Sequence, residues 1–336
     1  MAAIGIGLSP VLGSKAAAVV LAAPANLALS ITGAARDVIT ATWDAVSGAT
    51  NYEVEYSDDG VTYTPVDTTA LLTYGVTRAD YDIDAGKHYI RVRAVGGVEW
   101  ALSDIEGYEV GAVEAFPLDQ ASGNETGAIS GTVAVDNQTV GSNTGKTAPL
   151  AREFIRANND YFTIASPPAI FNFAGDFTIA GWAYAIDTAG GVVLNRLDAS
   201  GGGSVRGYAL GFGGGGKIQW WCGDSHGNDF NAITYSAATW YQMLLEYTAS
   251  TKTTACSVNN ANLQTTVSGV DVVHANGMFL GTFYDQNFNS SSRMNGWWFW
   301  NRRLSAAQRT RFYNGGDGVP TSGYLIVTEG DSLTSG

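Results

Sequence analysis

The stretch from Arg293 to Gly316 constrains the fold more than any other part of the chain. Its first part contains four consecutive aromatic residues, Trp297 to Trp300. Neighbouring side chains in a strand point to opposite faces, so the run predicts one aromatic pair on each face. Ser305 then fits a helix N-cap, with Gln308 at the N3 position of a capping box. The helix is expected to stop at the Asn-Gly-Gly signal that begins at Asn314. We expect this strand and helix to close a β-sandwich.

Composition and spacing predict an all-β protein. Glycine is abundant (42 residues), charged residues make up 15% of the chain, and short alternating segments recur between Gly, Asn, Asp and Ser clusters. The net charge is -13 and no basic stripe is present, which argues against a nucleic-acid partner. No apolar run reaches the length of a membrane span. The two cysteines, Cys222 and Cys256, either pair across two strands or fill small buried spaces.

Residues 1–23 are apolar, small and rich in Ala and Gly, with Lys15 as the one basic residue. A signal peptide would place a basic region before its apolar core, which this segment lacks. The alternative is an N-terminal arm that becomes ordered on packing into a neighbouring subunit or a larger assembly. The segment loosely resembles the openings of phage structural proteins, which implies a homo-oligomer that contacts other virion proteins through this arm.

Residues 24–112 are expected to form a first domain. Alternating segments, a hairpin signal after Ser57 and the position of Trp43 resemble a fibronectin type III domain. That resemblance implies that Trp43 is the core tryptophan and that Tyr89 occupies the tyrosine-corner position. With 14 acidic and 5 basic residues, the domain fits a solvated spacer better than a binding module.

Residues 113–320 are expected to form a second, larger domain. The phrases Phe177–Trp182, Trp240–Gln242 and Phe279–Gly281, with the Asn-Arg-Arg-Leu-Ser turn after Trp300, resemble the laminin-G-like (concanavalin A-like lectin) family. The resemblance implies a jelly roll, because these residues are mostly core positions. The predicted fold class is therefore two tandem β-sandwiches, the fibronectin type III-like one followed by the concanavalin A-like one.

Residues 321–336 read as a linker, a short β-run and the sequence Gly-Asp-Ser-Leu-Thr. This resembles the first block of GDSL/SGNH hydrolases, an α/β fold, and implies that Ser332 is a catalytic nucleophile if the chain continues into such a domain. A serine nucleophile needs a base and an oxyanion hole. The histidines of this chain all precede Ser332, so the chain as given holds no complete esterase site, and enzymatic activity is left open.

Carbohydrate binding is the sharper functional hypothesis for the second domain, because sugars stack on aromatic rings while Asn, Asp and Gln supply directional hydrogen bonds. The candidate ligand-binding residues are Trp220, Trp221, Asp224, Asn228, Trp298 and Trp300. Two polar segments, 224–229 and 284–289, are expected to be loops that rim a ligand. The alternative is that the outward-facing aromatics are covered by a loop or by another subunit.

No cofactor or metal is predicted, and calcium is kept as an alternative. Family members commonly carry an acidic run where this chain has 294–296 (Met-Asn-Gly), which weakens a metal-linked binding mode. Loop aspartates stand at no spacing that demands a metal: Asp224, Asp229, Asp271 and Asp285. Glu246 is the best-placed carboxylate for catalysis within residues 1–320, but it has no partner carboxylate in the sequence pattern.

Together these features predict a modular protein of a virion or cell surface. In this hypothesis it is a phage structural, fibre or decoration protein that engages surface glycans and carries a downstream esterase. One alternative is that these are the accessory modules of a secreted bacterial GDSL/SGNH carbohydrate esterase. The other is a purely structural decoration protein without a ligand.

Overall fold

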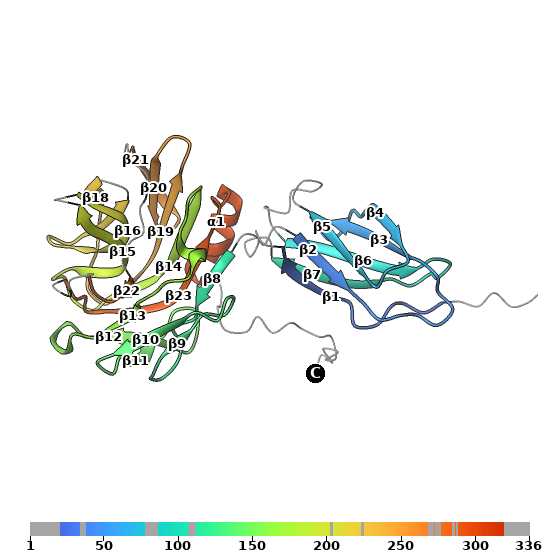
Figure 1. The fold of residues 1–336 in the computed structure, drawn as a ribbon, viewed down its shortest axis with the longest axis horizontal. Helices are drawn as coiled ribbons and strands as arrows, with labels where there is room; N and C mark the ends of the chain where they lie inside the picture. The colour runs from blue at the N-terminus through green and yellow to red at the C-terminus, as the bar shows by residue number, and fades with distance from the viewer. Residues whose placement is uncertain are drawn as a thin grey trace, which may run out of the picture.

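The computed structural model describes residues 21–33, 38–77, 87–106, 112–201, 204–222, 225–267, 272, 277–283, 286 and 288–318. Within these ranges the paired strands are antiparallel, accompanied by one α-helix and short 3-10 turns. The predicted all-β class is confirmed. Figure 1 shows the strands gathered into two separate groups, each built from two sheets. No helix in the described part of the chain is long and apolar enough to cross a membrane.

The first group is a seven-stranded sandwich. Its smaller sheet has the order β1 (Ala28–Thr32), β2 (Val38–Thr42) and β5 (Thr73–Thr77). Its larger sheet has the order β4 (Thr64–Thr69), β3 (Tyr52–Ser57), β6 (Lys87–Ala94) and β7 (Ala101–Glu106). Side chains from both sheets form one apolar core, and the indole of Trp43 packs edge-on against Tyr52 inside it.

The position of Tyr89 differs from the expectation. Side chains on β6 alternate, and those that face the core are His88, Ile90, Val92 and Ala94. Tyr89 is therefore on the outer face, where its ring lies close to Gly60. The core position belongs to His88, whose Nδ1 is 2.8 Å from the hydroxyl of Tyr56. The assignment of Tyr89 was wrong by one residue, which in a strand is a change of face.

The second group is a larger sandwich. One sheet has the order β18 (Ser225–Thr234), β17 (Lys217–Cys222), β16 (Ser204–Gly213), β15 (Gly191–Gly201), β22 (Met278–Leu280), β13 (Tyr161–Ile164), β10 (Val133–Asn137) and β9 (Glu125–Thr126). The other has the order β11 (Gly141–Thr144), β12 (Leu150–Phe154), β23 (Ser292–Trp300), β14 (Phe177–Ala185), β19 (Thr239–Thr248), β20 (Thr253–Val258) and β21 (Ala261–Val267), with β8 (Ala112–Phe116) also paired to β23. Strands adjacent in space are often distant in sequence.

Strand β23 supplies aromatic rings to both of its faces, as the alternation predicted. Trp297 and Phe299 belong to the core between the two sheets. The indole of Trp297 fills the space over Gly181 of β14, where a Cβ atom would lie 2.3 Å from the ring. The opposite face of β23 is covered as well, so both aromatic pairs are buried.

Helix α1 (Ala306–Tyr313) covers that opposite face, and its predicted ends are confirmed. The Ser305 side chain accepts from the backbone N–H of Gln308, the reciprocal half of the capping box is formed, and Asn314 adopts the left-handed C-cap conformation. The ring of Phe312 stands edge-on over Trp298 and Trp300, at centroid distances of 6.3 and 5.2 Å.

Charged groups fasten α1 to the sheet beneath it. The carboxylate of Glu246, fully buried on β19, accepts from one guanidinium nitrogen of Arg309 at 2.9 and 3.1 Å. Arg303 lies 3.6 Å from the same carboxylate. Glu246 is thus an ion-pair partner of the closing helix. Cys222 and Cys256 form no disulfide and are both buried in the core between the sheets.

Candidate functional site

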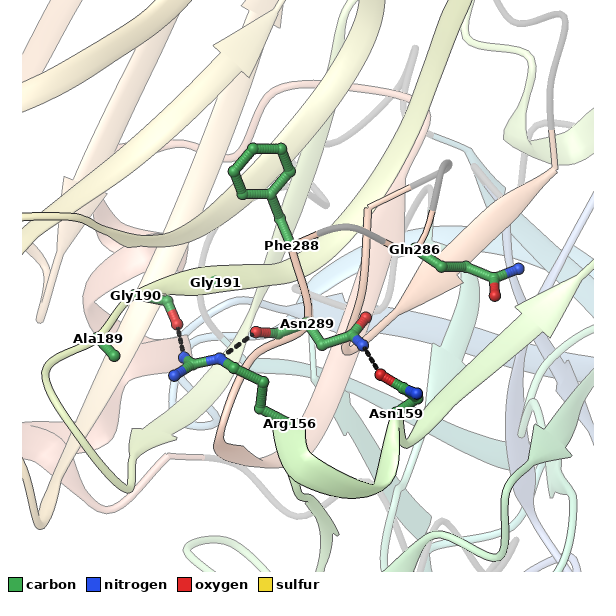
Figure 2. A pocket seen from close by; sticks show the side chains of 8 residues that line it. All are labelled: Arg156, Asn159, Ala189, Gly190, Gly191, Gln286, Phe288 and Asn289. Atoms are coloured by element: carbon green, nitrogen blue, oxygen red, sulfur yellow. Dashed lines mark hydrogen bonds between the residues drawn. The ribbon is translucent and has the colours of Figure 1, made fainter.

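A pocket of about 420 Å³ opens where three connections of the larger sandwich meet. The first is the 3-10 turn η2 (Arg156–Asn158) between β12 and β13, the second joins β14 to β15, and the third joins β22 to β23. The described residues that line it are Arg156, Asn159, Ala189, Gly190, Gly191, Gln286, Phe288 and Asn289 (Figure 2). Its volume is in the range of small-molecule sites.

Arg156 joins the three connections. Its Nε donates to the backbone carbonyl of Asn289 at 2.8 Å, and a terminal nitrogen donates to the carbonyl of Gly190 (Figure 2). The other terminal nitrogen lies 3.5 Å from the Asp187 carboxylate. Two fixed backbone contacts hold the planar guanidinium in one orientation at the wall of the pocket.

A chain of amide and hydroxyl groups fixes the floor. The buried Asn195 amide donates to the carbonyl of Thr282, and the Thr282 hydroxyl donates to Oδ1 of Asn289. Nδ2 of Asn289 then donates to Oδ1 of Asn159 at 2.7 Å (Figure 2). Because the carbonyl oxygen of Asn159 is engaged, its NH₂ group is the end that remains for a ligand. The exposed Asn159 is therefore oriented from the interior of the sandwich.

Phe288 is the aromatic side chain among the described lining residues and is 61% exposed. It stands edge-on to Phe283, with ring centroids 5.7 Å apart. Phe283 in turn packs against an apolar cluster of the sheet below, Val192, Leu197 and Ala209. The ring is supported from beneath and leaves a face open to solvent, which is the arrangement that a sugar ring uses for stacking.

The backbone near Phe288 has one enforced conformation. Gly191 has φ +130°, and a Cβ atom there would lie 2.5 Å from the Cα of Ser290. This close approach lets the Val192 N–H donate to the carbonyl of Phe288 at 3.1 Å. A side chain at Gly191 would push the Phe288 segment away, so glycine is needed for the pocket to keep its shape.

The predicted site residues that the structure describes are not among the residues that line this pocket. Trp220 points into the core between the sheets, where it is 2% exposed. Trp221 is half-buried on the opposite face of β17, against the same apolar cluster that supports Phe283. Asn228 lies on β18 opposite Trp220, so the expectation of a loop at 224–229 was wrong for residues 225–229, and Asp224 lies outside the described residues.

The expectation that Trp298 and Trp300 form a sugar platform needs correction. Their rings stack on each other at 5.8 Å, and Phe312 of α1 closes over them. Both are at most 2% exposed. No ring face is left for a ligand. The sequence left open whether a sugar, a loop or another subunit covers these rings, and the structure shows that helix α1 of the same chain covers them.

Three further expectations concern metals and catalysis. Among the described residues there is no group of three or more His, Cys, Asp or Glu side chains placed to hold a metal ion. Asp271 and Asp285 lie outside the described ranges, as does the segment that contains Ser332. Glu246 is occupied by Arg309 beneath α1 and has no access to a substrate.

The 284–289 segment was predicted to rim a ligand, and its described residues Gln286, Phe288 and Asn289 line the pocket. The prediction missed Arg156 and Asn159. Arg156 and Asn289 are 133 positions apart in the sequence, and no local sequence pattern indicates that they are in contact. The Asn-Asn-Asp sequence at the end of η2, typical of a turn, is the one available signal.

No protein-family model matches this chain, and no curated protein matches it significantly. Among solved structures, a Trypanosoma rangeli sialidase in complex with the inhibitor DANA has a TM-score of 0.47 at 12% identity, covering 62% of this chain and 34% of that one. The binding domain of botulinum neurotoxin DC in complex with SialylT has a TM-score of 0.47 at 9% identity, covering 62% and 52%. The chain thus spans a third to a half of these structures. At TM-scores below 0.5 they assign neither a ligand nor an activity to it.

Proposed function

We propose that the larger sandwich is a glycan-binding module and that the Arg156–Phe288 pocket is its site. The observation that carries this proposal is Phe288, an exposed ring that lines the same pocket as polar side chains held by hydrogen bonds. Ligand pockets combine apolar or aromatic side chains with a small number of polar groups that fix the ligand's orientation. A sugar offers an apolar face to the ring and hydroxyl groups to the amides of Asn159 and Gln286.

Binding fits this pocket better than catalysis. The described lining residues include no carboxylate, histidine, cysteine or serine, so they supply no general acid, base or nucleophile. Amide side chains and a guanidinium hold a ligand by hydrogen bonds without transferring protons. The contribution of the pocket is therefore recognition and retention of the sugar.

In this proposal the glycan-binding module is one part of a modular surface protein. In this proposal residues 24–112 form an acidic spacer, residues 113–320 display the pocket, and residues 1–23 attach the chain to an oligomer or to neighbouring virion proteins. A virion surface is the proposed location, and a secreted protein is the alternative. The GDSL block with Ser332 belongs to a downstream domain in this arrangement, and its test is an Asp-x-x-His block in the gene beyond Gly336.

The experiment is a glycan array probed with the full chain, followed by titration of each hit against the wild type and Asn159→Ala. We expect Asn159→Ala to weaken binding. Because Asn159 has a left-handed φ of 56° and accepts a hydrogen bond from Asn289, this variant also lowers the thermal unfolding midpoint slightly, and affinity is therefore measured well below that midpoint. Absence of binding across the array would refute the proposal and favour a structural decoration protein. Binding that Asn159→Ala leaves intact would move the site elsewhere.

A further inference from the structure

We propose that the pocket selects a sugar that carries a carboxylate, with Arg156 as the group that binds the anion. This inference rests on the glycan-binding function proposed above and adds the chemical class of the ligand. It starts from the charge of the pocket. Arg156 is the one charged side chain among the described lining residues, in a chain whose net charge is -13.

The guanidinium retains donors for a ligand. Its contacts with described residues use Nε–H, one N–H toward Gly190 and one toward Asp187, which is three of the five that an arginine carries. The side chain is 34% exposed. Since its orientation is already fixed by two backbone carbonyls, little conformational entropy is lost when the remaining N–H groups meet a carboxylate.

Asp187 is the group that a ligand carboxylate would replace. The ion pair with Arg156 is long, at 3.5 Å, and partly solvated, so it stabilises the free protein little. Asp187 is also turned toward its own loop, where Oδ1 accepts the Ala189 N–H at 2.9 Å. The cation is neutralised weakly in the empty pocket, and a ligand carboxylate in the pocket can approach it more closely than Asp187 does.

A single carboxylate on a sugar ring suits the pocket better than a densely charged polyanion. One planar guanidinium matches one planar carboxylate in shape. Phe288, which lines the same pocket, supplies an apolar ring for the sugar face, which a free inorganic anion could not use. The strong negative charge of the whole chain disfavours highly charged polymers at long range.

The first test compares paired ligands on the unaltered full chain by isothermal titration. The pairs are tri-galacturonic acid with its methyl ester, and 3′-sialyllactose with lactose. We expect at least one acid to bind about tenfold or more tightly than its neutral partner, as a charge-assisted hydrogen bond implies. Which pair responds separates a uronic acid from a sialic acid.

Two variants complete the test. Asp187→Asn removes the competing carboxylate and is expected to tighten the acid severalfold while leaving the neutral partner unchanged. Arg156→Lys keeps the positive charge but loses the planar guanidinium that can bind both carboxylate oxygens, and it is expected to remove most of the preference for the acid. Arg303→Lys is the matched control, because Arg303 is also partly exposed and weakly paired, at 3.6 Å from Glu246.

The outcomes separate the two proposals. Equal affinity for acid and neutral ligand would overturn the anion inference and leave glycan binding standing. An acid preference that survives in Arg156→Lys and does not respond to Asp187→Asn would also overturn it. Failure of all four ligands and of the array would refute the glycan-binding function, and with it the inference.

Discussion

Replacing Phe288 by alanine should weaken glycan binding without weakening the fold. A phenylalanine carries roughly 150–250 Å² of surface that burial can remove. Phe288 is 61% exposed, so about 90–150 Å² of that surface still faces solvent. A sugar that covers one face removes about half of this area from water, which at ~25 cal/mol/Å² amounts to about 1–2 kcal/mol.

This free energy corresponds to a loss of roughly 5- to 30-fold in affinity. The assay is isothermal titration of the best array ligand into the wild type and Phe288→Ala, with thermal unfolding of both proteins measured in parallel. Val267→Ala is the matched control, because it removes another exposed apolar side chain, 68% exposed, from β21 of the same sandwich. Unchanged affinity in Phe288→Ala, or an equal loss in Val267→Ala, would refute the reasoning.

Three further predictions concern stability and are measured by urea or guanidinium unfolding. Phe312→Ala should lower the free energy of unfolding by about 3–5 kcal/mol, because it uncovers the tryptophans of β23. A decrease in the free energy of unfolding no larger than that of a surface substitution would contradict this packing. Ser305→Ala should cost about 1 kcal/mol through the capping box, while Ser305→Thr should be nearly neutral. Burial raises the pKa of Glu125 from 4.5 to about 7, against the attraction of Arg152. The folded state then holds this proton more tightly than the unfolded chain, so its contribution to stability is complete below about pH 4.5 and is lost as pH rises through 7. Glu125→Gln should flatten that fall, and an unchanged pH profile would show that Glu125 does not cause it.

The local patterns of the sequence were sufficient for the closing strand and helix. The alternation of Trp297 to Trp300 and the Ser305–Gln308 capping box depend only on neighbours in the chain. Both predictions are confirmed by β23 and α1. The sequence could not say what covers the outer face of β23, because that depends on how the chain returns after Trp300.

The pocket required the structure. Arg156, Gly190 and Asn289 come from three connections that the sequence separates by more than 30 residues, and their contacts are made by backbone carbonyls that no side-chain pattern reveals. The error at Tyr89 has a related cause. Neighbouring residues of a strand point to opposite faces, and β6 carries a ring side chain on each face, His88 on one and Tyr89 on the other. The residue types alone therefore do not say which of the two rings faces the core.

The central claim is that a sugar binds over Phe288. A crystal structure of the full chain with its best array ligand tests this most directly. We expect a sugar ring stacked on Phe288, with hydrogen bonds to Asn159 and a contact to Arg156. A sugar seated away from this pocket, for example beside Trp221 on β17, would contradict it.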